Sequence, residues 1–182
     1  MKRLTYSVVA GSLLMLAVQA ARAQDEEFVR GQIVDRRNKE HSGYIRAREG
    51  NGDIRFKAQE GTTTYRTYPR NSLRGIKTRP PQAWAAMGKA WAQKNYDGVL
   101  KAADGFSEQA LWLGWGGRVQ FYKGRALEAQ NEMKKAETAY RKGLRYAVGE
   151  GTGIKGTLQR AILALQIARG APGVEDRVKT LA

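Results

Sequence analysis

The sequence predicts an α+β protein: a small curved β-sheet or barrel, followed by an array of α-helical hairpins. In the first part of the chain, short runs of alternating polar and apolar residues are separated by glycine-containing turns. After Pro80 and Pro81, apolar residues recur at every third or fourth position, the period of an amphipathic helix. We therefore expect a signal peptide over 1–23, a small β-domain over 24–79 and a helical repeat domain over 80–182.

The first residues have the pattern of a secretory signal. Lys2 and Arg3 precede an uncharged apolar run over 7–20, and Ala21 and Ala23 give the small-x-small pattern that signal peptidase cleaves. The apolar run is shorter than the roughly 20 residues of a membrane helix. We expect export to a bacterial periplasm or cell envelope, with no membrane span after cleavage. The alternative is that the segment is retained as an N-terminal anchor.

The composition excludes several kinds of site. Cysteine is absent, which rules out disulfides, thiolate nucleophiles and Cys-ligated metals, and a single His cannot form a multi-histidine centre. No set of positioned acid, base and nucleophile is visible, so we expect no enzyme, no cofactor and no metal. The 32 Lys and Arg residues outnumber 17 Asp and Glu residues, which favours acidic partners.

Five short strands are expected in the β-domain. They are predicted over 28–34, 43–48, 53–58, 62–68 and 73–77. In the third, Ile54 and Phe56 alternate with Arg55 and Lys57, so that one face is apolar and the other basic. So few short strands cannot cover both faces of a flat sheet, which favours a strongly curved barrel. An open sheet packed on the helices is the other arrangement that the sequence allows.

The order of these cues resembles small Sm-like or SH3-like barrels. The resemblance lies in the segments 31–34, 50–52, 54–56, 68–70 and 73–76. It covers roughly fifty residues and implies the shape of the domain only.

The segment after the prolines resembles the tetratricopeptide repeat. Trp84, Met87 and Trp91 are the large residues of a first helix, and Gly88 is the small residue where the partner helix is expected to approach. A turn follows at 95–97, and a second helix begins near 99. The large side chains are expected in the core.

A second unit repeats this pattern. Gly124 lies 36 positions after Gly88, against a family period of about 34 residues, and a turn over 131–133 precedes the second helix. The second helix has small or large residues at the family spacing, namely Ala136, Tyr140, Gly143 and Leu144. Residues 106–117, between the units, match least well and are expected to be apolar filler. The segments 156–169 and 174–181 are expected to form a C-terminal capping hairpin.

The tetratricopeptide resemblance implies a non-catalytic protein-binding scaffold with a concave groove. The positions that would face this groove are Ala85, Lys89 and Ala92 in the first unit, and Arg118, Phe121, Arg125 and Glu128 in the second. We take Lys89, Arg118, Phe121 and Arg125 as the partner-binding residues. The basic residues suit an acidic peptide or a C-terminal carboxylate. Alternatively, they are solvated side chains without a ligand.

Basic and aromatic residues also recur along the β-domain. The basic residues are Arg46, Arg48, Arg55, Lys57, Arg66, Arg70 and Arg74, and the aromatic ones are Tyr44, Tyr65 and Tyr68. Such a surface is typical of polyanion binding, and the alternative function is therefore a binder of anionic lipid, glycan or nucleic acid, with the repeats as support. Expected export argues against nucleic acid as the natural ligand.

Two further patterns are expected to carry no chemistry. The glycines over 151–156 have the spacing of a dinucleotide-binding turn, but no strand precedes them, so we expect a flexible loop between helices. His41 is alone, and we expect it to be solvated in a turn.

Overall fold

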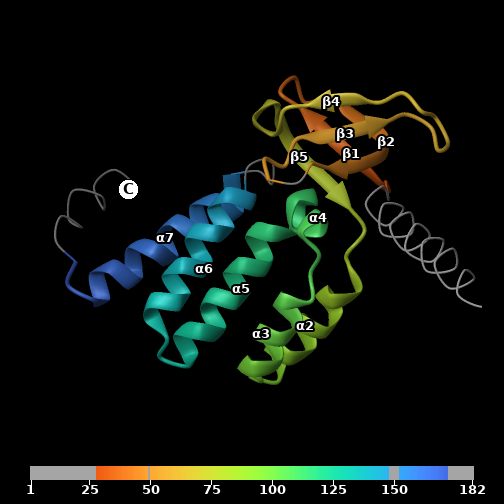
Figure 1. The fold of residues 1–182 in the computed structure, drawn as a ribbon. Coiled ribbons are helices and arrows are strands. Elements are labelled where there is room, and N and C mark those ends of the chain that lie inside the picture. The colour runs from red at the N-terminus through yellow and green to blue at the C-terminus, as the bar shows by residue number, and fades with distance from the viewer. Residues whose placement is uncertain (1–27, 49, 148–151, 172–182) are drawn as a thin grey trace, which may run out of the picture.

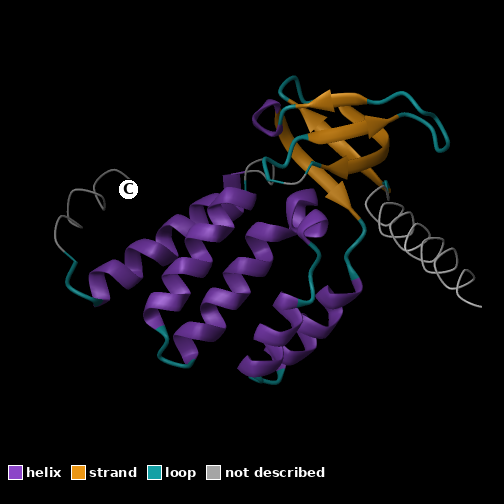
Figure 2. Cartoon of the chain, in the orientation of Figure 1, coloured by secondary structure: helices purple, strands orange, loops and turns teal. Residues whose placement is uncertain are grey.

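A five-stranded antiparallel sheet followed by helices makes up the described part of the chain, which comprises residues 28–48, 50–147 and 152–171 of a computed structural model (Figures 1 and 2). The α+β class predicted from the sequence is thus confirmed. The predicted signal peptide and the predicted segment 174–181 lie outside the described residues. No helix among those described is long and apolar enough to cross a membrane.

All five predicted strands are present. They are β1 (Val29–Asp35), β2 (Glu40–Ala47), β3 (Ile54–Lys57), β4 (Arg66–Tyr68) and β5 (Leu73–Thr78). β4 is shorter than predicted, because residues 62–65 lie outside the ladder. The strand order is β4-β3-β2-β1-β5, with β4 and β5 at the edges. The described sheet is therefore open and packed against the helices, and the preference for a closed barrel is not met.

The two faces of the sheet differ as the alternation predicts. Ile33, Ile45 and Ile54 are fully buried on the inner face. The ladder places Arg30 opposite Tyr44, and Arg46 opposite Arg55, on the other face. Because successive residues of a strand point to opposite faces, the outer face carries the polar residues of β2 and β3 together with Arg30 and Gln32 of β1.

The helical part consists mainly of hairpins. Its elements are α2 (Gln82–Ala92), α3 (Tyr96–Asp104), α4 (Glu108–Ala110), η2 (Leu111–Trp115), α5 (Gly116–Ala129), α6 (Met133–Tyr146) and α7 (Thr152–Ala168), and a short helix η1 (Arg70–Ser72) joins β4 to β5. Short turns join α2 to α3 and α5 to α6, with Lys94 and Asn131 at positive φ. Residues 152–156 are helical, so the predicted flexible loop is wrong there.

The two glycines of the predicted repeats have different surroundings. A Cβ on Gly124 would overlap the ring of Tyr140, so α5 and α6 approach closely there, as predicted. A Cβ on Gly88 would meet nothing within 4 Å, so the predicted helix contact at Gly88 is wrong. In the first hairpin the close approach is instead between Ala90 and Gly98, where an added Cβ would lie 3.1 Å from the Ala90 Cβ.

Residues 106–117, which match the repeat pattern least well, contribute buried side chains to the core. Within η2, Leu111, Trp112 and Leu113 are buried, and Gly114 has φ +105°, a conformation that L side chains rarely adopt. A Cβ on Gly114 would lie 3.0 Å from the carbonyl oxygen of Ile76 in β5. Glycine thus allows the helical part to break direction and meet the sheet here.

The sheet and the helices share one hydrophobic cluster, which extends from Ile33 in β1 to Tyr146 at the end of α6. Figure 1 shows the sheet over the end of the helical array, beside α4. Arg70 crosses this junction with only 4% of its surface exposed. Its guanidinium donates to the carbonyl oxygens of Trp112 and Tyr146, the latter at 2.5 Å. From the sequence, Arg70 was expected on the basic surface of the β-domain. Its burial shows that this expectation is wrong.

Candidate functional site

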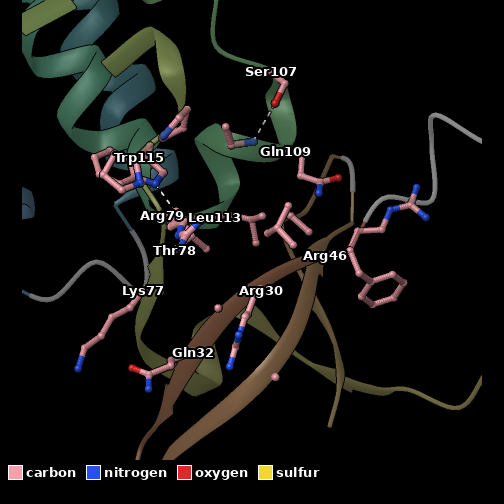
Figure 3. A pocket seen from close by; sticks show the side chains of 18 of the residues that line it. Arg30, Gln32, Arg46, Lys77, Thr78, Arg79, Ser107, Gln109, Leu113 and Trp115 are labelled. Atoms are coloured by element: carbon pink, nitrogen blue, oxygen red, sulfur yellow. Dashed lines mark hydrogen bonds between the residues drawn. The ribbon is translucent and has the colours of Figure 1, made fainter. Parts of the chain in front are cut away.

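A groove of about 1250 Å³ lies between the sheet and the helical part (Figure 3). Its sheet side is formed by β1 and β2, and its other sides by the 78–81 segment and by α4 with η2. A pocket for a small ligand has a volume of roughly 300–1000 Å³. The size of this groove therefore suits a segment of a longer ligand.

Positive charge dominates the lining. Arg30, Arg46, Lys77 and Arg79 line the groove, and Glu108 is the acidic residue among the lining side chains. Figure 3 shows Arg79 beside η2, and Lys77, Arg30 and Arg46 on the side of the sheet. Arginine and lysine side chains of this kind bind carboxylates and phosphates through charge-assisted hydrogen bonds.

The carboxylates near the groove already have partners. Glu108 accepts a hydrogen bond from Trp112 Nε1 at 3.1 Å, and Glu40 binds Lys77 Nζ at 2.6 Å. Within the described part of the chain, Arg30, Arg46 and Arg79 form no ion pair. These three guanidinium groups are therefore available to an external anion.

Hydrogen bonds fix the wall beside Arg79. Trp115 Nε1 donates to Thr78 Oγ1 at 2.8 Å, and this hydroxyl lies 3.3 Å from the carbonyl oxygen of Leu113. At the start of α4, Ser107 Oγ accepts from the backbone N–H of Ala110 and caps this helix. The walls are thus formed before any ligand arrives, which reduces the entropy cost of binding.

On the outer face of the sheet, next to the groove, Tyr44 is bonded to an acid. Its hydroxyl donates to Glu60 at 2.8 Å, and this hydrogen bond raises the pKa of the Tyr44 phenol. Burial and the charge of Glu60 raise the pKa further, while Arg30 lowers it. Glu60 is thus hydrogen-bonded to a neutral phenol and forms no ion pair with the neighbouring Arg30.

The groove offers charge and hydrogen-bond donors. Among the described residues, no group of three or more His, Cys, Asp or Glu side chains could hold a metal ion.

His41 is half-buried in β2, 3.2 Å from Asp35, and not in a solvated turn as expected. It contacts Phe56 and Tyr68, with ring centroids 6.2 and 6.0 Å away, and belongs to the packing of the sheet.

None of the four residues predicted to bind a partner lines this groove. Lys89 is exposed on α2, while Arg118, Phe121 and Arg125 lie on α5. Aromatic contacts place α2 beside α5, since the Tyr122 ring lies 5.8 Å from Trp84 and 5.2 Å from Trp91.

Two of the four have partners within the protein. Phe121 is half-buried against a second hydrophobic cluster, which joins α5, α6 and α7, and its ring lies 6.0 Å from that of Tyr140. Arg125 pairs with Glu128 at 2.6 Å. Arg118 is exposed, and its guanidinium lies 5.7 Å from the Trp115 ring.

Of the four basic residues that line the groove, the sequence pattern pointed to Arg46 but not to Arg30, Lys77 or Arg79. A usable signal was present, because Arg30 and Gln32 in β1 and Ser42 and Arg46 in β2 alternate with apolar or small residues. The pairing of β1 with β2 and β5 then brings these polar positions together.

Comparisons with known proteins return no match. No family model matches the chain, and neither a curated protein nor a solved structure is significantly similar to it. Its function is therefore inferred from its own residues.

Proposed function

We propose that this protein is an exported, non-catalytic scaffold that holds an acidic segment of a partner protein in the cationic groove. The observation that carries the proposal is the set of three arginines, Arg30, Arg46 and Arg79, which line one groove without an ion pair in the described chain. The N-terminal pattern over 1–23 supports export.

An acidic polypeptide fits the chemistry of this lining. The planar guanidinium group forms paired hydrogen bonds with a carboxylate, which fixes orientation as well as charge. The hydroxyl of Ser42 and the amide of Gln32, joined at 2.8 Å, add polar groups suited to a peptide backbone. The volume of the groove, which exceeds that of an ordinary small-molecule pocket, favours a polypeptide segment over a small molecule.

We also propose that α2–α3 and α5–α6 are tetratricopeptide-like hairpins that support the groove. The short turns with positive φ at Lys94 and Asn131, and the close approach at Gly124, support this assignment.

The outer faces of α2 and α5 form a second candidate surface for an acidic partner. Lys89 and Arg118 are exposed there, and the contacts of Tyr122 with Trp84 and Trp91 bring the two helices together. Because Arg125 is engaged by Glu128, this surface has fewer unpaired cations than the groove.

Fluorescence anisotropy with a labelled glutamate-rich peptide tests the main proposal. We expect Arg46→Glu to weaken binding by about tenfold or more, since it replaces an attraction by a repulsion. Lys134→Glu is the matched control, because Lys134 is exposed on α6 and changes the net charge equally. We expect the control to change the affinity less than about twofold.

Two outcomes would overturn the groove assignment. Equal losses in Arg46→Glu and Lys134→Glu would mean that only net charge attracts the peptide. A large loss in Arg118→Glu with none in Arg46→Glu would move the site to the α2–α5 surface.

A further inference from the structure

We propose that the acidic segment continues beyond the groove, in an extended conformation, across the outer face of the sheet. It would follow a cationic track, defined as Arg79, Arg30, Arg46 and Arg55. This inference rests on the proposed function, because the groove holds the first part of the segment. It adds a minimum length and a charge spacing for the partner.

The strand register places the track on one face. Arg30 in β1 lies opposite Tyr44 in β2, and Arg46 lies two residues beyond Tyr44, on the same side of the sheet. Arg46 is directly opposite Arg55 in β3. At the other end, Arg79 follows Thr78, which pairs with Gly31 next to Arg30. The track thus leads from the end of β5 over β1 and β2 to β3.

The spacing of the track can be estimated from sheet geometry. From Arg30 to Arg46 the track crosses one strand, about 4.8 Å, and advances two residues, about 6.6 Å. The Cα atoms of these two residues are therefore separated by about 8 Å. Alternate side chains of an extended peptide are about 7 Å apart, so carboxylates at every second position match the step from Arg30 to Arg46.

One contact in the track is unfavourable in the free protein. Arg46 and Arg55 are directly opposed, and like charges at such positions destabilise a sheet. Neither has an ion pair in the described part of the chain. A carboxylate between them would replace repulsion by two attractions, so this pair favours an anionic ligand.

Aromatic rings hold the far end of the track in place. The Arg55 guanidinium lies 4.8 Å from the centroid of Tyr65, whose side chain is 46% exposed. Beside it, Lys57 Nζ lies 4.1 Å from the Phe28 ring. Cation–π contacts restrain a side chain without neutralising its charge. The cations remain available to a ligand and lose less entropy when they bind it.

The track sets the length of the partner segment. The three steps from Arg79 to Arg55 are about 5, 8 and 5 Å long, so the track spans about 18 Å and requires about six extended residues. The partner is therefore an acidic polypeptide segment of at least that length, with carboxylates at alternate positions.

A length series of peptides tests the track. Labelled peptides of four and twelve residues, with glutamate at every second position, are titrated into the purified protein and into three variants. We expect Arg55→Gln to weaken binding of the longer peptide by about three- to tenfold and to leave the shorter one unchanged. Arg46→Gln should weaken both. Arg66→Gln is the control, because Arg66 is exposed on β4 and pairs in register with Phe56 of the inner face.

The outcomes separate this inference from the function beneath it. If Arg46→Gln weakens both peptides and Arg55→Gln weakens neither, the track is wrong and the groove remains. If no peptide binds, or no variant changes binding, the proposed function itself fails. If a sulfated glycan or an oligothymidylate of equal charge displaces the longer peptide at lower concentration, the assignment to a polypeptide is overturned.

Discussion

Arg70 links the sheet to the helical part by donating hydrogen bonds to the carbonyl oxygens of Trp112 and Tyr146. Tyr146 is the last residue of α6, so its carbonyl has no partner in the helix and accepts from Arg70 at 2.5 Å. A cation at this end also interacts favourably with the helix dipole. The guanidinium additionally lies 5.1 Å from the Trp112 ring, on the helical side of the junction.

We predict that Arg70→Met lowers the free energy of unfolding by about 2–4 kcal/mol, because two buried carbonyls lose a charged donor. Urea denaturation at neutral pH measures this. Arg66→Met is the control, since Arg66 is exposed and forms no ion pair within the described residues; it should change stability by less than about 0.5 kcal/mol. Equal effects in the two variants would contradict the role assigned to Arg70.

Glu137 joins α6 to α7. It binds Arg141 and Arg169, each at 2.7 Å, and accepts from Gln166 at 3.1 Å. The hydrogen bond from Arg141 is the main reason why the pKa of Glu137 lies below its ordinary value of 4.5. A lowered pKa means that the charged form stabilises the fold above pH 4.5. This contribution is lost as the pH falls through the lowered pKa.

Accordingly, Glu137→Gln should lower the free energy of unfolding by about 1 kcal/mol at pH 7. The difference from the unmodified protein should shrink below pH 4.5 and be lost once the pH has fallen below the lowered pKa of Glu137. Urea titrations at several pH values give the comparison. A difference that stays constant from neutral to acid pH would show that the charge of Glu137 is not the cause.

At the level of the elements, the helix contacts depend on small residues in particular places. The α5–α6 contact requires a glycine at 124, since a Cβ there would overlap the buried Tyr140 ring. The α2–α3 contact makes no such demand at Gly88, which is exposed. Glycine at the same repeat position thus permits a close helix contact at 124 but makes no helix contact at 88.

The two glycines make a matched pair of variants. Gly124→Ala should destabilise the protein by about 1–3 kcal/mol, because the buried ring has little room to move. Gly88→Ala should stabilise it by about 0.5–1 kcal/mol, because alanine favours the helix and meets no neighbour. Thermal or urea unfolding of both variants measures the difference. Destabilisation of similar size at both positions would mean that Gly88 also lies at a helix contact.

At the scale of the molecule, the shared hydrophobic cluster predicts that sheet and helices unfold together. Trp112, 5% exposed, packs against Tyr146 at a ring distance of 4.7 Å and belongs to the same cluster as Ile33. We predict that Trp112→Ala lowers stability by about 3–5 kcal/mol and equally for both parts. Amide hydrogen exchange in β1 and in α5 measures the two parts separately. Loss of protection in α5 alone would show that the sheet is an independent domain.

Local pattern predicted the elements well and their contacts poorly. Alternation at Ile54 and Phe56 located β3, and the two prolines at 80 and 81 located the segment between the sheet and α2. Propensity could not show that residues 106–117 are core, because their burial depends on the kink at Gly114 and on its contact with β5.

The candidate site was harder to predict for the same reason. Arg30 and Arg79 are separated by 49 positions and come to one groove only through the pairing of β1 with β5. The register of that pairing is set by burial of Ile33 against Ile76, which no local pattern reveals. Repeat resemblance, by contrast, directed attention to Lys89 and Arg118 on the helices.

An NMR titration of the isotope-labelled protein with the twelve-residue glutamate peptide tests the central claim most directly. The proposed groove predicts the largest amide shifts along β1 and β2 and in the segments 78–81 and 107–110, with little change near Lys89 or Arg125. Shifts concentrated on α2 and α5, with the sheet unaffected, would contradict the groove and place the binding surface on the helices.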